Sequence, residues 1–113
     1  MHELTLAMSL IDLVSEHLGN EPPEEVSSID LEIGSLSGVD TEAMNLAFTI
    51  ATKDTGLRLA KLNFHDTIGK GHCNSCDREF IMQSLLDLCP DCSNPASKII
   101  QGSDLRLVSI TLK

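Results

Sequence analysis

Four cysteines fall in two pairs late in the chain, and each pair has the spacing of a metal-binding turn. The pairs are Cys73 with Cys76 and Cys89 with Cys92, and twelve residues separate them. Each CxxC turn aims two sulfurs at one point, and four thiolates complete the tetrahedral coordination of Zn²⁺. Because such a site leaves no position for water, we expect a structural zinc rather than a catalytic one.

A pair of redox centres is the alternative interpretation of the same thiols. A thioredoxin-like site needs one CxxC, at the start of a helix that follows a strand. Residues 69–102 hold two pairs and lack this context, so zinc is favoured. With so few apolar groups in this segment, metal binding would supply its folding free energy, about 10 kcal/mol or more by analogy with zinc fingers. A small local cluster is expected from Phe80, Ile81, Leu85, Leu86 and Leu88.

We expect that His17, His65 and His72 are not zinc ligands. His72 abuts Cys73, and we expect it to be solvated or to support the site from outside; the alternative is a ligand that exchanges with a thiolate as pH changes. Four thiolates already fill a tetrahedral site, which favours the first interpretation. His17 and His65 are expected at the surface or at a strand edge.

The first three residues, Met1, His2 and Glu3, form a second candidate metal site. The α-amine, the amide nitrogen of His2 and its imidazole Nδ1 can chelate one ion in fused five- and six-membered rings. Ni²⁺ and Cu²⁺ suit such square-planar nitrogen ligation, whereas Zn²⁺ does not. The fourth position is open to the amide or carboxylate of Glu3, or to water. On these residues alone the simpler interpretation is a polar first helical turn, because a short motif is a weak match.

Periodicity predicts the elements that must position these groups. Residues 3–18 have helical spacing, with Leu4, Ala7, Met8, Ile11 and Val14 on the apolar face. Strict alternation predicts a strand over 28–33, and Asp40 or Thr41 can cap a second helix that runs to about Asp54. Further strands are expected over 60–65 and 104–112. The expected buried face of the second helix comprises Ala43, Met44, Ala47, Phe48 and Ala51.

Together these elements predict an α+β fold, with two helices on one face of a three-stranded sheet and an inserted small zinc-ribbon domain. The expected division is 1–68 with 103–113 as the α+β domain that carries the candidate nickel site, and 69–102 as a zinc-binding domain.

Composition excludes several classes of partner. The chain of 113 residues has 17 acidic and 8 basic residues, a formal net charge of −9. Nucleic acids and anionic membranes need a cationic footprint, so neither is expected as a partner. No apolar run is long enough to span a bilayer and no secretion signal is evident, so we expect a cytoplasmic protein.

Several stretches together resemble one family. The opening MHE, the run LEIGSLSGVDTEAMNLAF over 31–48, the pairs CNSC and CPDC, and the ending GSDLRLVSITLK are similar to the HypA/HybF hydrogenase nickel-incorporation proteins. The resemblance covers nearly the whole chain and favours the chelating interpretation of the first three residues. It implies nickel ligation at His2, with Met1 and Glu3 contributing, and a structural zinc on the four cysteines.

The resemblance further implies a carrier rather than an enzyme. It would deliver Ni(II) during maturation of nickel–iron hydrogenase, and in some members urease, with a HypB-type GTPase and the hydrogenase large-subunit precursor as partners. A homodimer is left open. Some relatives carry His directly after a CxxC, whereas Asp77 and Ser93 stand there in this chain. The alternatives are a zinc-ribbon interaction module without nickel transfer, and a thiol redox protein.

Overall fold

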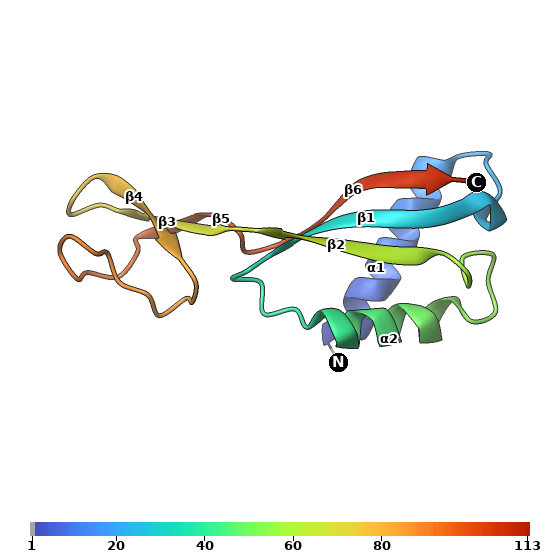
Figure 1. Ribbon diagram of the computed structural model, residues 1–113, viewed down its shortest axis with the longest axis horizontal. Helices are drawn as coiled ribbons and strands as arrows, with labels where there is room; N and C mark the ends of the chain where they lie inside the picture. Colours follow the sequence, from blue (N-terminus) through green and yellow to red (C-terminus); the bar gives the residue numbers. More distant parts are fainter. Residues whose placement is uncertain (1) are drawn as a thin grey trace. The chain divides into compact units, whose positions relative to one another are not determined.

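The computed structural model describes residues 2–113, apart from the side chain of His2. Within this range the chain forms two α-helices, one short 3-10 turn and two three-stranded sheets (Figure 1). The elements are α1 (His2–Leu18), η1 (Pro23–Glu25), β1 (Val26–Gly34), α2 (Thr41–Thr52), β2 (Lys61–Thr67), β3 (Gly69–Cys73), β4 (Arg78–Met82), β5 (Lys98–Gln101) and β6 (Leu105–Leu112).

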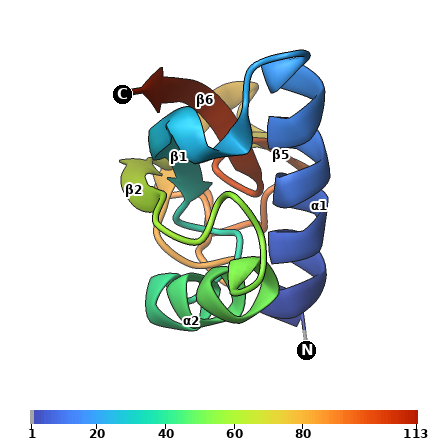
Figure 2. The ribbon, with the colours of Figure 1, turned by 90° about the vertical axis from the view of Figure 1, so that its right-hand side faces the viewer.

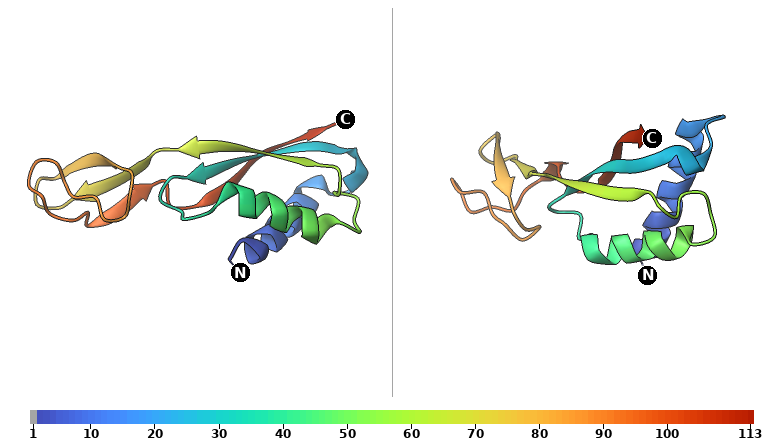
Figure 3. Two further views of the ribbon diagram at one scale, coloured as in Figure 1. Left: turned by 60° about the horizontal axis from the view of Figure 1, so that its bottom comes forward. Right: turned by 45° about the vertical axis from the view of Figure 1, so that its right-hand side comes forward.

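The first sheet has the strand order β2-β1-β6, and both helices lie on one side of it (Figures 2 and 3). The predicted arrangement of two helices on a three-stranded sheet is therefore confirmed. Alternation along β1 places Ile29, Leu31 and Ile33 in the buried phase, as the sequence predicts. In β6 the phase differs from expectation, because Val108 is exposed while Leu105 and Leu107 are half-buried.

Helix α1 buries a stripe that is rotated from the predicted one. Ala7, Leu10, Val14 and Leu18 are buried, at i, i+3 and i+4 spacing. Met8, which was expected on the buried face, is 58% exposed. The reason is that leucines occupy both flanks of α1, so the sequence alone does not fix which part of the wide apolar face meets the sheet.

Helix α2 begins where predicted and ends two residues earlier. Asp40 is its N-cap, and its carboxylate accepts hydrogen bonds from the amides of Glu42 (2.9 Å) and Ala43 (3.3 Å). Met44, Ala47 and Phe48 are buried as expected, whereas Ala43 and Ala51 are half-buried. The Asp40 cap therefore fixes the start of α2, and the buried face of this helix has the predicted phase.

The second sheet has the order β4-β3-β5, with β3 antiparallel to both neighbours. Its small core consists of Leu36, Cys73, Phe80, Met82 and Cys89. The expected local cluster is wrong except for Phe80, because Ile81, Leu85, Leu86 and Leu88 are all exposed. The place expected for these residues is taken by the two buried cysteines, by Met82 of β4 and by Leu36 of the loop over 34–38.

The chain divides into two compact units. Unit 1 comprises Met1–Leu31, Val39–Phe64 and Leu107–Lys113, and unit 2 comprises Glu32–Gly38 and His65–Arg106. Unit 2 thus includes the GSLSG loop over 34–38, which the sequence suggested only as a connection. The prediction of 69–102 as a separate domain concerns independent folding and stays a prediction.

Hydrogen bonds and close packing hold the GSLSG loop in unit 2. The amide of Gly34 donates to the Asp104 carbonyl (2.9 Å), and the amide of Leu36 donates to the Gly102 carbonyl (2.8 Å). A side chain at Gly34 would collide with the Gly102 carbonyl, and Gly102 itself has φ +90°. Glycine is therefore required at both positions, and the loop is locked in place rather than free.

Candidate metal sites

The two CxxC turns are placed by the second sheet. β3 ends at Cys73 and β4 begins at Arg78, so the first pair lies in the hairpin that joins them. The second turn is closed by backbone hydrogen bonds around Cys89: its amide donates to the Asn94 carbonyl (2.8 Å), and its carbonyl accepts from the Ser93 amide (2.8 Å). Both turns are thus fixed by backbone bonding before any metal is considered.

The residue that follows each pair adopts a left-handed conformation. Asp77 has φ +53° and Ser93 has φ +62°, and within residues 2–113 these are the non-glycine positions with positive φ. Such a conformation costs free energy for most side chains, and Asp and Asn bear it best. The matched strain at the two turns follows from the need to fold each pair of sulfurs back toward one point.

The four sulfurs meet at one place. All lie within 4.8 Å of one another, and Cys73 Sγ and Cys92 Sγ are 3.5 Å apart. A tetrahedral zinc with Zn–S bonds of about 2.3 Å separates its sulfurs by about 3.8 Å. The donor set, its spacing and its burial, with Cys73 and Cys89 buried, therefore fit a closed tetrahedral thiolate site.

Crowding of the thiols lowers the acidity of Cys76 when no cation is present. A hydrogen bond with Cys92, then burial, then a hydrogen bond with Cys89 raise the pKa of Cys76 to about 12. A cation that binds here must therefore displace the proton of Cys76.

Neighbouring polar groups support the cluster from outside. The side-chain amide of Asn94 donates to Cys92 Sγ (3.4 Å) and to Ser75 Oγ (3.1 Å), which ties the two turns together. Arg78 and Asp91 form an ion pair at 2.8 Å across the same turns. No local pattern predicts these contacts, since Asn94 and Ser75 are nineteen residues apart.

His72 lies beside the cluster and not in it. Its Nδ1 is 3.1 Å from Asn74 Oδ1, and its Nε2 is 3.3 Å from Asp77 Oδ1. With both ring nitrogens directed at oxygen acceptors, the ring orients the first turn instead of meeting the sulfurs. This agrees with the expected supporting role of His72.

The other candidate site opens helix α1. The helix begins at His2, and Glu3 is half-buried in its first turn. Met1 and the side chain of His2 lie outside the described residues, so the nickel ligands predicted there remain a prediction. The first amides of a helix have no acceptor within it, so metal ligation at those nitrogens breaks no helical hydrogen bond.

With both sites described, comparison with known proteins decides the family. The family model for "Hydrogenase/urease nickel incorporation, metallochaperone, hypA" matches residues 1–112. The chain belongs to this family. It is 38% identical to the hydrogenase maturation factor HypA of Parabacteroides distasonis, across all of this chain and 98% of that one. It is 36% identical to the HypA of Geotalea daltonii, across 99% of each.

Solved structures agree with the family. The solution structure of the nickel metallochaperone HypA from Helicobacter pylori matches with a TM-score of 0.70 and 26% identity, across 97% of this chain and 96% of that one. A second HypA solution structure matches with a TM-score of 0.69 and the same identity. Family members are metallochaperones and maturation factors, not enzymes. Among the described residues, no helix is long and apolar enough to cross a bilayer.

Proposed function

We propose that this protein is a nickel carrier, which binds Ni(II) at its first three residues and delivers it during maturation of nickel–iron hydrogenase. The observation that carries the proposal is the family match over residues 1–112. The ligands are the amine of Met1, the amide and imidazole of His2, and Glu3. Supporting this, α1 begins at His2, so these groups lie at a helix start whose amides lack helical acceptors.

The chemistry of the helix start suits a bound cation that must leave again. The positive end of the helix dipole opposes a cation there, but loss of amide protons on binding offsets the charge of the ion. Glu3 adds a negative charge in the first turn. A chelate at a chain end can be released by fraying of one turn, whereas a closed cluster of four thiolates cannot release its metal without unfolding.

We propose in addition that Cys73, Cys76, Cys89 and Cys92 hold a structural Zn(II). The support is their mutual distances and their burial. When bound, zinc would supply the charge that lets four crowded thiols ionise. Residues of this chain then keep the site closed: Asn94 binds a sulfur, and the Arg78–Asp91 pair joins the two turns.

The family's work defines the proposed partners. We assign a HypB-type GTPase as the partner in nickel handling and the hydrogenase large-subunit precursor as the recipient, both in the cytoplasm. Urease is the second recipient that the family description includes. A homodimer remains an expectation from the sequence.

Calorimetric titration of Ni²⁺ into untagged, zinc-loaded protein tests the nickel site. Wild type should bind about one Ni²⁺, and His2→Ala should abolish that binding. A protein with one Gly added before Met1 should also lose it, because the α-amine moves out of the chelate. His17→Ala is the matched control, since this exposed histidine lies at the other end of α1 and should bind as wild type does. Equal nickel binding by all variants would refute the proposal.

A zinc assay separates this account from a thiol redox protein. We expect one zinc per chain and four thiols protected from alkylation until a chelator is added. A metal-free protein whose thiols cycle to disulfides without loss of fold would favour the redox alternative.

A further inference from the structure

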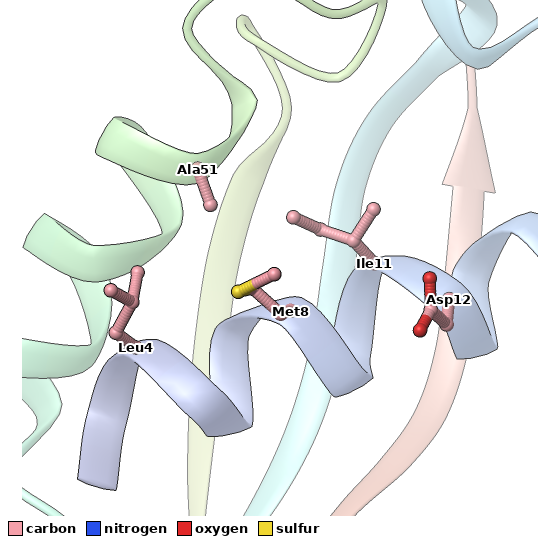
Figure 4. A pocket seen from close by; sticks show the side chains of 5 residues that line it. All are labelled: Leu4, Met8, Ile11, Asp12 and Ala51. Atoms are coloured by element: carbon pink, nitrogen blue, oxygen red, sulfur yellow. The ribbon is translucent and has the colours of Figure 1, made fainter. Parts of the chain in front are cut away.

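An apolar groove lies between the two helices of unit 1 (Figure 4). Leu4, Met8 and Ile11 line it from successive turns of α1, and Ala51 lines it from α2. Its volume is about 300 Å³. That is the low end of the range for small-molecule sites, so the groove suits side chains of a protein rather than a cofactor.

The lining is apolar, and part of it faces solvent. Met8 is 58% exposed, while Leu4, Ile11 and Ala51 are half-buried. On α2, Leu46 and Ile50 stand one turn apart and are each 61% exposed. Exposed apolar side chains grouped on a helix pair mark an interaction surface, and a flexible methionine lets such a surface adapt to its partner.

The charges on the α1 side of the groove have one sign. Within its bounds, helix α1 carries the acids Glu3, Asp12 and Glu16. Helix α2 carries the acid Glu42, and neither helix contains Lys or Arg between its first and last residue. Asp12 lines the groove, and among the described residues it has no ion-pair partner. Glu16 stands one turn beyond Asp12 on the same flank of α1. An occupant that lies along α1 would therefore meet the negative charges of Asp12 and Glu16, while Lys53, the C-cap of α2, follows Ala51 by two residues.

We propose that this groove binds a cationic amphipathic helix of a partner protein. Apolar side chains of that helix, spaced one turn apart, would pack against Leu4, Met8 and Ile11, and its Lys or Arg side chains would face Asp12 and Glu16. A second copy of this chain fits poorly, because the same acids would oppose each other across a symmetric contact. Anionic lipid is disfavoured by the same charges. The inference does not depend on the nickel site.

Titration with designed peptides tests the proposal on the full-length, zinc-loaded protein. The probe is a synthetic helical peptide of about fourteen residues with Leu at i, i+4 and i+7 and Lys on the flanks; its counterpart has Glu for every Lys. Amide NMR shifts should map the cationic peptide to residues 4–12 and 51, and the anionic peptide should not bind. We expect Asp12→Lys to weaken binding by about fivefold or more at low salt, and Met8→Gln by about tenfold.

Matched controls are Glu21→Lys, an exposed acid beyond the end of α1, and Leu86→Gln, an exposed leucine of unit 2. Both should bind the cationic peptide as wild type does, and thermal melts should show that all four variants fold. Equal binding of the two peptides, or shifts that map outside the groove, would overturn the proposal. So would sedimentation that shows a wild-type dimer which Met8→Gln dissociates, because a second copy would then be the occupant.

Discussion

The core of unit 1 is built from aliphatic and aromatic side chains, whereas two of the five buried members of the unit 2 cluster are cysteines. In unit 1, Val14, Ile29, Met44 and Phe48 come from three elements and remove their surfaces from water without a cofactor. Unit 2 leaves Leu85 and Leu86 at the surface and places sulfurs inside. Unit 1 therefore has an apolar core that can stabilise it by packing alone, whereas we expect unit 2 to depend on the metal proposed for its thiols.

Removal of the metal should have the largest effect on the difference in stability between the two units. A chelator, or Cys73→Ser, should unfold unit 2 and leave unit 1 folded, because zinc supplies about 10 kcal/mol or more to such small sites. Amide NMR spectra would show loss of dispersion over residues 32–38 and 65–106 alone. Ser75→Ala, in the same turn but without a sulfur, should keep the metal. Persistent dispersion in metal-free unit 2 would contradict the account.

A cavity in unit 1 should have the opposite effect. Phe48→Ala should lower the free energy of unfolding by about 3–5 kcal/mol, because this ring is buried in the apolar core. Chemical denaturation, followed by NMR signals of α1, measures the loss, and the zinc content should not change. Leu46→Ala, at a 61% exposed position two residues earlier on α2, should cost about 0.5 kcal/mol or less. Loss of zinc in Phe48→Ala would show that the stability of unit 2 depends on the folding of unit 1.

The GSLSG loop offers a third test. Gly34→Ala should destabilise unit 2 by about 1–3 kcal/mol, because the new methyl group collides with the Gly102 carbonyl. Thermal unfolding of zinc-loaded protein measures this. Gly38→Asn is the control: its φ is +73°, which Asn tolerates, and the space around it is open. A neutral Gly34→Ala would mean that the loop is not locked.

Loss of the N-cap of α2 should lower the free energy of unfolding by less than the changes above. Asp40→Ala should cost about 1 kcal/mol, because the amides of Glu42 and Ala43 lose their acceptor. Urea denaturation gives the change, and Asp54→Ala, beyond the end of α2, should have no measurable effect. Equal costs for the two variants would deny Asp40 its role.

The pH dependence of unit 2 should follow its metal, with the smallest effect near neutrality. Without a cation the pKa of Cys76 is raised to about 12, so Zn²⁺ must displace a proton from this thiol. Zinc-loaded protein should therefore lose stability as pH falls, because protons compete for the thiolates. Metal-free protein, whose unit 2 should be unfolded, should melt through unit 1 alone and lack this slope. Melting temperatures against pH, with and without chelator, check both expectations. The same slope in both metal states would show that the metal does not set the thiol charge.

Sequence alone predicted the elements well where periodicity and caps are strong. Asp40 predicts the start of α2 as its N-cap, and the alternation of Ile29, Leu31 and Ile33 predicts the buried face of β1. The rotation of α1 could not be predicted, because its leucines make nearly every face apolar and only contact with the sheet selects one.

The gathering of the four cysteines was predictable and its surroundings were not. CxxC spacing brings two sulfurs together through local geometry, which a sequence records. The insertion of Leu36 and the bond from Asn94 to Cys92 depend on contacts made in the folded unit. The exposure of Leu86 likewise follows from the turn over 84–87, where Asp87 accepts from the Gln83 amide at 2.7 Å.

X-ray absorption at two edges of one sample tests most directly the claim that the two regions hold different metals. The sample is untagged protein with one equivalent each of Ni(II) and Zn(II). We expect a nickel edge of square-planar type with only nitrogen and oxygen neighbours, and a zinc edge with four sulfurs at about 2.3 Å. Sulfur around nickel, or a zinc shell without four sulfurs, would contradict it.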